Sequence, residues 1–290
     1  MKPWGAIPAP QFNLRLTLES GQVFHWVPEG DGYCGLIGER PVRVEQVGQE
    51  LRVTPGTEEA VARYFALDHD LEAICASFPA DPTMAQAAAF CSGLRLIRQP
   101  LWECVATFLT SSMKQVAHIR QMSHALRQRF GRSIPGWGVA VYPEPERLAR
   151  ATEAELRGCG LGYRAKHLLG TARSIAEGAV DLEALRALDD AEALAELCRL
   201  PGVGPKIANC ALLFGYERLR AFPIDVWIER VLRRSYFARK RKVTAGQLRE
   251  FAANAFGPYG GYAQQYLFHH ARSQPRAGGG VKTSATRRAP

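Results

Sequence analysis

The hydrophobic pattern of this 290-residue chain changes type near residue 57, and that change limits the folds open to it. Before this point, short apolar runs at 33–37, 41–47 and 50–54 are separated by Gly-rich breaks, which is typical of antiparallel hairpins. From Thr57 the apolar residues follow helical spacing, and after about residue 90 no convincing strand remains. The pattern therefore predicts an α+β protein, with an N-terminal antiparallel β-sheet domain with helices packed on a larger all-helical domain.

Other signals refine this prediction. The alternation over 12–18 predicts a half-buried strand, and residues 23–26 predict a further extended segment. Asp81-Pro82 predicts a helix start, and Pro135 to Pro145 a loop. We expect helices over 101–130 (interrupted around Ser111-Ser112), 152–158, 164–177, 190–199, 205–215, 225–236, 244–256 and 259–272. The predicted domains are 1–90, 91–273, and a basic, disordered tail over 274–290.

Charge divides the chain at the same place. Lys and Arg number 37 against 28 Asp and Glu, a formal net charge of +9. Residues 1–90 hold 12 acidic and 6 basic side chains, whereas residues 91–290 hold 16 acidic and 31 basic ones. The excess positive charge predicts a polyanionic partner for the second part of the chain.

Several classes of protein and site are excluded. No stretch approaches the ~20 apolar residues that cross a bilayer, and the Pro-rich N-terminus has no apolar core like that of a signal peptide. The cysteines are odd in number, seven, with no CxxC spacing. We therefore expect reduced thiols, a cytoplasmic or nucleoid-associated protein, no membrane partner, and no metal or iron–sulfur site.

The segment Leu200–Ala208 carries the most information. A helix is expected to end near Arg199, Gly202 and Gly204 form a tight turn, and Pro205 opens the next helix. Glycines let another backbone approach closely, and the free N–H groups of a helix start favour an anion. The turn therefore suits a DNA phosphate bound without regard to base sequence. A purely structural helix–turn–helix is the alternative.

An amine and a carboxylate accompany this turn. Lys206 lies in it, and Asp225 stands 19 residues later at an expected helix start. A lysine amine can attack the C1′ of a sugar, and a carboxylate can stabilise the positive charge or move the proton. A free lysine is almost wholly protonated at neutral pH. Attack therefore needs either desolvation or a nearby cation to lower the lysine pKa, or removal of the proton as the reaction proceeds. The alternatives are that Lys206 contacts a phosphate and that Asp225 is an N-cap. Sequence spacing alone favours these roles about as much as the catalytic ones.

Several motifs together resemble a known family. They are Leu16–Trp26, Leu96–Gln99, Gly160–Ala165, Leu200–Lys206 with Pro223-Ile224-Asp225, and Tyr262–Phe268. Across about Leu14 to Arg272 the chain is similar to the 8-oxoguanine DNA glycosylase/lyase branch of the helix–hairpin–helix superfamily of base-excision repair enzymes. Lysine at 206 points to the bifunctional members, and the first and last motifs point to the 8-oxoguanine branch.

The resemblance implies roles for six residues. Lys206 would displace the damaged base, form an imine with the sugar and allow β-elimination, and Asp225 would assist it. Gly21 would accept from the N7–H of 8-oxoguanine, whereas guanine would present a second acceptor there. Gln264 would bind the Watson–Crick edge, and Phe268 and Cys210 would cover the two faces of the flipped base. Without the resemblance, the simpler interpretations are that Phe268 is an ordinary core aromatic and that Cys210 is a small buried side chain.

The resemblance also implies contacts with the DNA around the flipped base. Tyr163 would wedge into the duplex and Arg164 would contact the orphaned cytosine; the simpler interpretation is a loop aromatic beside a solvated charge. Three departures bear on this: Met113 and His118 stand where asparagine and arginine are common, and Trp227 replaces a phosphate-binding histidine. We therefore expect retained damage recognition with looser selection of the opposite base.

The sequence as a whole predicts a bifunctional glycosylase/AP lyase that acts on double-stranded DNA containing oxidised guanine. The alternatives are a monofunctional glycosylase for alkylated bases and a non-catalytic module that binds damaged DNA. The resemblance implies no cofactor beyond a monovalent cation at the hairpin carbonyls. We expect a monomer.

Overall fold

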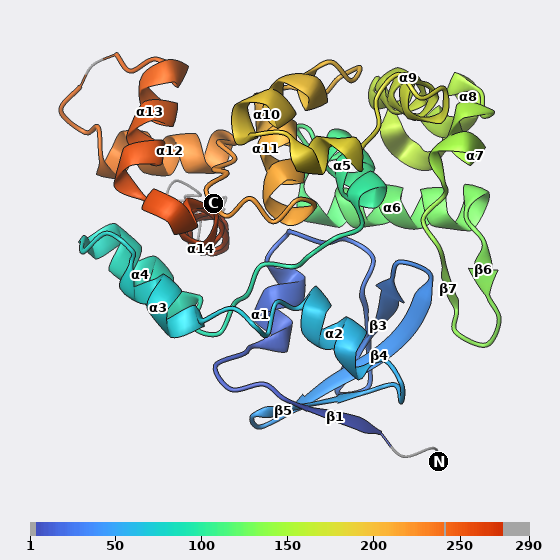
Figure 1. The fold of residues 1–290 in the computed structure, drawn as a ribbon, viewed down its shortest axis with the longest axis horizontal. Helices are drawn as coiled ribbons and strands as arrows, with labels where there is room; N and C mark the ends of the chain where they lie inside the picture. The colour runs from blue at the N-terminus through green and yellow to red at the C-terminus, as the bar shows by residue number, and fades with distance from the viewer. Residues whose placement is uncertain (1–3, 241, 275–290) are drawn as a thin grey trace, which may run out of the picture.

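The computed structural model describes residues 4–240 and 242–274 (Figure 1). Its N-terminal part is a five-stranded antiparallel sheet in the order β1-β5-β4-β3-β2. The strands are β1 (Gly5–Pro8), β2 (Val27–Glu29), β3 (Gly32–Ile37), β4 (Arg40–Val47) and β5 (Glu50–Val53). Alternate side chains of β4 and β5, such as Val42, Val44, Leu51 and Val53, are fully buried. The three predicted hairpin strands are therefore confirmed.

Two predictions about the first 30 residues are wrong. Residues 12–18 do not form a strand; Leu14–Glu19 is helix α1, because the Asn13 side chain caps it by accepting from Leu16 N at 2.9 Å. Residues 23–26 are a loop rather than a strand. The sequence also missed β1, whose one proline, Pro8, is tolerated because β1 is an edge strand.

The helices follow the prediction closely. They are α2 (Glu58–Tyr64), α3 (Leu71–Ala76), α4 (Pro82–Phe90), α5 (Leu101–Thr110), α6 (Val116–Phe130), α7 (Pro145–Ala149), α8 (Glu153–Leu156), α9 (Arg164–Ala176), α10 (Asp190–Cys198), α11 (Pro205–Phe214), α12 (Val226–Ser235), α13 (Ala245–Ala255) and α14 (Gly260–Ser273). Asp81 caps α4 as predicted. Beyond residue 90 one small hairpin was missed, β6 (Ser133–Ile134) with β7 (Val139–Ala140), because two-residue strands show no periodicity. The α+β fold class is confirmed.

Apolar packing divides the molecule into two clusters. The smaller lies between the sheet, α1 and α2, and the larger fills the helical part (Figure 1). Helices α3 and α4 pack with the larger cluster through Leu71, Ile74 and Met84, and α4 lies against α14. The domain boundary near residue 90 stays a prediction, and most of the predicted tail lies outside the described residues.

A buried ionic cluster joins the two parts. The Glu103 carboxylate of α5 pairs with Arg127 of α6 and lies 3.1 Å from His25 Nδ1. The other ring nitrogen of His25 lies 2.7 Å from the Leu36 carbonyl of the sheet. Burial by itself raises the pKa of Glu103, but the charges of Arg127 and His25 overcome this and lower it to about 2. The cluster therefore fixes the loop after Gly21 onto the helical part.

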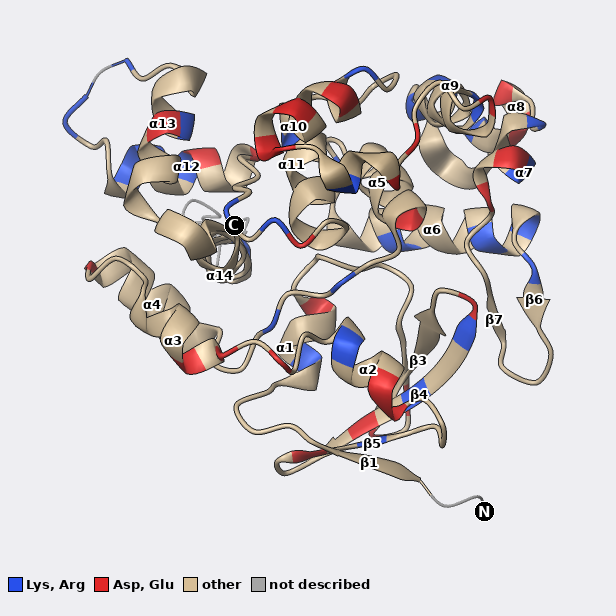
Figure 2. Ribbon diagram, viewed as in Figure 1, with Lys and Arg blue, Asp and Glu red and all other residues tan. Residues whose placement is uncertain are grey.

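Charged side chains are unevenly placed. Figure 2 shows Lys and Arg along the α12–α13 loop, and Asp and Glu on α10.

None of the helices in 4–240 and 242–274 combines the length and the apolar character that crossing a membrane requires. The seven cysteines all lie within the described residues, and each is a free thiol.

Candidate active site

The residues predicted for catalysis and base binding lie around one cavity of about 940 Å³. Its walls come from the turn after α1, the α5–α6 loop, α11, the start of α12, and α14. The predicted residues that line it are Lys206, Asp225, Gly21, Gln264, Phe268, Cys210 and Met113. Among the residues that the structure describes, no cluster of three His, Cys, Asp or Glu side chains could hold a metal ion.

Lys206 projects from the first turn of α11 against an aromatic wall. Its Nζ donates to Ser111 Oγ at 3.3 Å and lies 5.4 Å from the centre of the Phe108 ring. Phe108 itself stacks on Phe214, with ring centres 5.2 Å apart. The amine is half-buried beside an open cavity, which is the environment of a lysine that meets a ligand.

Asp225 is both the N-cap of α12 and a wall of the cavity. Its Oδ1 accepts from Trp227 N at 3.0 Å and Ile228 N at 2.9 Å. Burial raises the pKa of the carboxyl, and these N–H groups together with the Lys206 charge partly oppose the rise. Asp225 is therefore a stronger base than a free aspartate, and the capping interpretation does not exclude a chemical one.

Gly21 lies in a turn that only glycine adopts easily. Its φ is +89°, and a Cβ there would lie 3.2 Å from Val116 Cγ2 and 3.3 Å from Phe268 Cε1. Gln22, fully buried, fixes the same turn by donating to the Arg95 carbonyl at 2.9 Å and accepting from Ile97 N at 2.8 Å. The turn is thus held at a fixed place in the cavity wall.

Gln264 and Phe268 lie one helical turn apart on α14. Gln264 is only 4% exposed, and its Oε1 is buried without a hydrogen-bond partner in the described structure. Buried amide oxygens are rarely left unpaired in folded proteins, so this amide has unused capacity for a ligand. Cys210, also buried, lies on α11 one turn after Lys206, and burial raises the pKa of its thiol.

The predicted hairpin joins α10 to α11. Gly202 has φ +81°, and a Cβ there would meet the His167 side chain of α9 at 2.6 Å. Gly204 is the N-cap of α11, and a Cβ on it would meet open space. Gly202 is therefore required by the fold, whereas Gly204 leaves the helix start open to approach.

The residues predicted to contact DNA near the flipped base differ in exposure. Met113 is 93% exposed with φ +53°, Tyr163 is 49% exposed, and His118 is exposed at the start of α6. Arg164 is only 5% exposed: it donates to the carbonyls of Ser112 and Leu161, and its guanidinium lies 4.3 Å from the Tyr163 ring centre. Three of its five N–H donors are used in these bonds, so Arg164 joins two loops, and a contact with cytosine would require the buried side chain to move.

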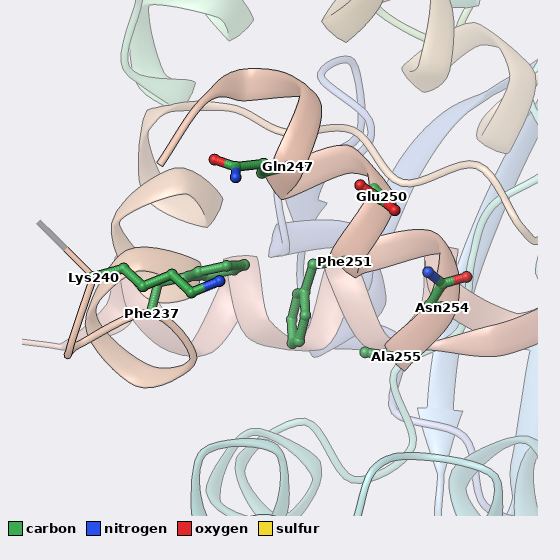
Figure 3. Close-up of a pocket in the computed structure, with 7 residues that line it drawn as sticks. All are labelled: Phe237, Lys240, Gln247, Glu250, Phe251, Asn254 and Ala255. Atoms are coloured by element: carbon green, nitrogen blue, oxygen red, sulfur yellow. The ribbon is translucent and has the colours of Figure 1, made fainter. Parts of the chain in front are cut away.

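Trp227 and a second, smaller cavity are two separate features near α12. Trp227 lines the main cavity and carries Arg230 over its ring, 5.5 Å from the centre. A second cavity of about 430 Å³ lies between the end of α12 and α13 (Figure 3). Its lining includes Phe237, Lys240 and Glu250, and includes no residue predicted for the site.

Sequence reasoning missed the residues that support the site. Gln99 donates to the Gln22 carbonyl at 2.7 Å, so the Leu96–Gln99 motif holds the Gly21 turn in place. Ser111 and Phe108 contact Lys206. From the sequence, Ser111 was predicted only as part of a helix interruption, and Phe108 was not singled out. A buried glutamine that makes one long-range hydrogen bond gives no periodic signal, so the motif alone did not reveal this role.

Comparisons with known proteins match both parts of the chain to described families. Residues 6–105 match the 8-oxoguanine DNA glycosylase N-terminal domain, and residues 106–255 match the HhH-GPD superfamily of base excision DNA repair proteins. The N-glycosylase/DNA lyase OGG1 of Arabidopsis thaliana is 31% identical over 281 residues, which cover 89% of this chain and 77% of the plant protein. A probable N-glycosylase/DNA lyase of Methanothermobacter thermautotrophicus is also 31% identical, with 92% of this chain and 95% of that protein covered.

A solved structure is similar over nearly the whole chain. The Clostridium acetobutylicum 8-oxoguanine glycosylase/lyase, in complex with double-stranded DNA containing cytosine opposite 8-oxoguanine, superposes with a TM-score of 0.87 at 30% identity. The match covers 94% of this chain and 96% of that one. Fold and hairpin thus define an HhH-GPD base-excision DNA repair protein. Within that superfamily, the chain belongs to the 8-oxoguanine DNA glycosylase family.

Proposed function

We propose that this protein is a bifunctional DNA glycosylase and AP lyase that excises 8-oxoguanine from double-stranded DNA. The observation that carries the proposal is the convergence of a half-buried amine, Lys206, and a carboxylate, Asp225, on one cavity with an unpaired buried amide, Gln264. The named relatives are N-glycosylase/DNA lyases, which supports the same activity.

The proposed chemistry assigns one role to each group. Lys206 Nζ attacks C1′ as the bond from C1′ to the base breaks, and the base leaves with the bonding electrons and a proton. Displacement leaves an aminal in which C1′ still carries the ring oxygen O4′; the C1′–O4′ bond then breaks, O4′ takes a proton, and a protonated imine forms between C1′ and Nζ. The imine acidifies C2′–H, and loss of that proton expels the 3′ phosphate. Asp225, a stronger base than free aspartate, takes the proton from the amine and stabilises the cationic sugar.

Recognition is proposed to use the turn and α14 together. The Gly21 carbonyl accepts from the N7–H of 8-oxoguanine, Gln264 pairs with the Watson–Crick edge, and Phe268 and Cys210 cover the two faces. The hairpin N–H groups around Gly202 and Gly204 bind one phosphate. Each of these roles is implied by the family resemblance, and positions in the cavity wall or beside the open helix start support it.

One trapping experiment tests the function. The protein is incubated with a duplex that holds 8-oxoguanine opposite cytosine, with borohydride present to reduce the imine. We expect a covalent protein–DNA adduct. Base release without an adduct would instead support a monofunctional glycosylase, and binding with neither would support a non-catalytic module.

Asp225→Asn separates chemistry from folding. We expect single-turnover excision to slow by about 10²- to 10⁴-fold, because asparagine cannot accept the amine proton. Asparagine caps helices as well as aspartate does, and it removes a carboxylate whose pKa burial raises, so the melting temperature should not fall. DNA affinity, measured by fluorescence anisotropy, should be nearly unchanged; equal losses of rate and affinity would mean that Asp225 is mainly structural.

Selection of the base opposite the lesion is proposed to be loose. The exposed Met113 side chain has no strong hydrogen-bonding group for an orphan base, and the Arg164 side chain is buried with three of its five N–H donors used by Ser112 and Leu161. A good bidentate base contact discriminates by ~1–3 kcal/mol, so we expect excision opposite cytosine to exceed that opposite other bases by less than about tenfold. Met113→Asn should raise the preference. A large wild-type preference for cytosine over all other bases would contradict the proposal.

Two minor parts of the proposal concern ions and assembly. A monovalent cation at the hairpin would have carbonyl ligands; the Leu200 carbonyl accepts one bond, from Val203 N, and keeps a second lone pair. Replacing potassium chloride by a bulky ammonium salt at equal ionic strength should then weaken DNA binding.

We propose that the protein is a monomer when it binds DNA. The molar mass measured by light scattering checks this.

A further inference from the structure

The two elements proposed to recognise the base come from distant parts of the chain. The Gly21 turn follows α1, beside the sheet, whereas Gln264 and Phe268 are carried by α14, near the end of the described residues. In Figure 1, α14 lies above and to the left of α1. The distance between the Gly21 carbonyl and the Phe268 ring therefore depends on how the turn is attached to α14.

Two side chains of α14 make that attachment through consecutive carbonyls. Gln265 Nε2 donates to the Ser20 carbonyl at 3.2 Å, and Arg272 Nη2 donates to the Glu19 carbonyl at 2.9 Å. Gln265 and Ser20 are both buried. The Arg272 guanidinium also lies over the Phe268 ring, 5.7 Å from its centre. One helix thus carries the predicted base-stacking ring and the donors that hold the turn.

The turn and the ring are already in close contact. A Cβ on Gly21 would lie 3.3 Å from Phe268 Cε1 and 3.8 Å from Arg272 Cζ. On the opposite side of the turn, Gln22 is fixed by Arg95 and Ile97. Loss of the α14 attachment would leave the turn held from one side only, and its carbonyl could then shift relative to Phe268.

We propose that Gln265 and Arg272 are positioning residues that set the place of the Gly21 carbonyl in the base-binding cavity. This inference rests on the proposed function. A fixed carbonyl repels the N7 lone pair of guanine and accepts from the N7–H of 8-oxoguanine. A carbonyl that can move loses both effects, because the repulsion is relieved and the hydrogen bond weakens. The two side chains therefore act on recognition of the damaged base through Gly21.

The test compares two reactions of the same protein. Excision of 8-oxoguanine needs the Gly21 carbonyl, whereas cleavage of a preformed abasic site has no base to recognise. For Arg272→Met and Gln265→Met we expect kcat/KM for excision to fall by about 10- to 100-fold, the size of effect that a misplacement of ~1 Å produces. Abasic-site cleavage should change by less than about twofold. Arg272→Lys, which keeps a donor and the charge, should recover most of the excision.

Arg218→Met is the matched control. Arg218 donates to two backbone carbonyls, Arg186 and Leu188, outside the cavity, so its loss should leave the ratio of excision to abasic cleavage unchanged. A wild-type ratio in both α14 variants, or equal losses in both reactions, would overturn the inference. Failure of the wild-type protein to excise 8-oxoguanine would instead refute the proposed function.

Discussion

We expect Lys206→Gln to abolish the borohydride-trapped adduct and to lower the rate of base release by more than about 10³-fold. Glutamine has no amine that can form an imine with the sugar, yet its amide can still contact the Ser111 hydroxyl on which Lys206 Nζ donates. The loss is therefore chemical rather than structural. Trapping yield on denaturing gels and single-turnover excision rates measure it, with the melting temperature as a check of folding.

Lys166→Gln provides the control for this variant. Lys166 is exposed on α9 and lies outside the lining of the cavity, so the variant removes an equal charge without touching the site. Trapping should persist there. An adduct that forms normally in Lys206→Gln would show that another amine is the nucleophile, and the assignment of Lys206 would be wrong.

We expect Arg127→Met to lower the free energy of unfolding by about 3–5 kcal/mol, because it leaves the Glu103 carboxylate buried without its main partner. It also leaves the Ala140 carbonyl without the bond from Arg127 Nη1. Urea unfolding at neutral pH measures the loss. The double variant Glu103→Leu/Arg127→Met should recover much of it, because an apolar pair of similar volume often replaces a buried ion pair at little cost.

The difference in unfolding free energy between the wild type and Arg127→Met should depend on pH with a defined sign. The folded-state pKa of Glu103 is lowered from 4.5 to about 2, so ionised Glu103 stabilises the native state above the unfolded value. This stabilisation is complete above about pH 5 and is lost as the pH falls toward 2. The wild-type advantage over Arg127→Met should therefore shrink on acidification; a constant difference from pH 7 to 3 would contradict the role assigned to Glu103.

Much of the fold could be predicted because its signals are local. The β3–β5 hairpins follow from alternation between Gly-rich turns, and α4 from the Asp81 cap. Alternation failed at α1, where Leu14, Leu16 and Leu18 fit both periods over so few residues. The Asn13 cap and the burial of Leu14, Thr17 and Leu18 on one face decide for a helix.

The residues around the cavity could be predicted from the sequence better than the residues expected to contact DNA. Lys206, Asp225, Gly21, Gln264 and Phe268 were named from motifs, and the structure gathers them around one cavity. Arg164 was named as a DNA contact but lies buried against Ser112 and Tyr163. Motif positions specify a residue type, whereas exposure depends on which loops pack against it.

The sequence by itself determined the order and type of most elements, the hairpin between α10 and α11, and the residues that can carry the chemistry. These depend on spacing, caps and glycines within a few residues of one another. Only the tertiary structure decided which groups support them: Ser111 beside Lys206, Gln99 on Gln22, and Gln265 and Arg272 on the Gly21 turn. Hydrogen bonds between residues tens to hundreds of positions apart leave no periodic trace, because they form only once packing brings the chain segments together.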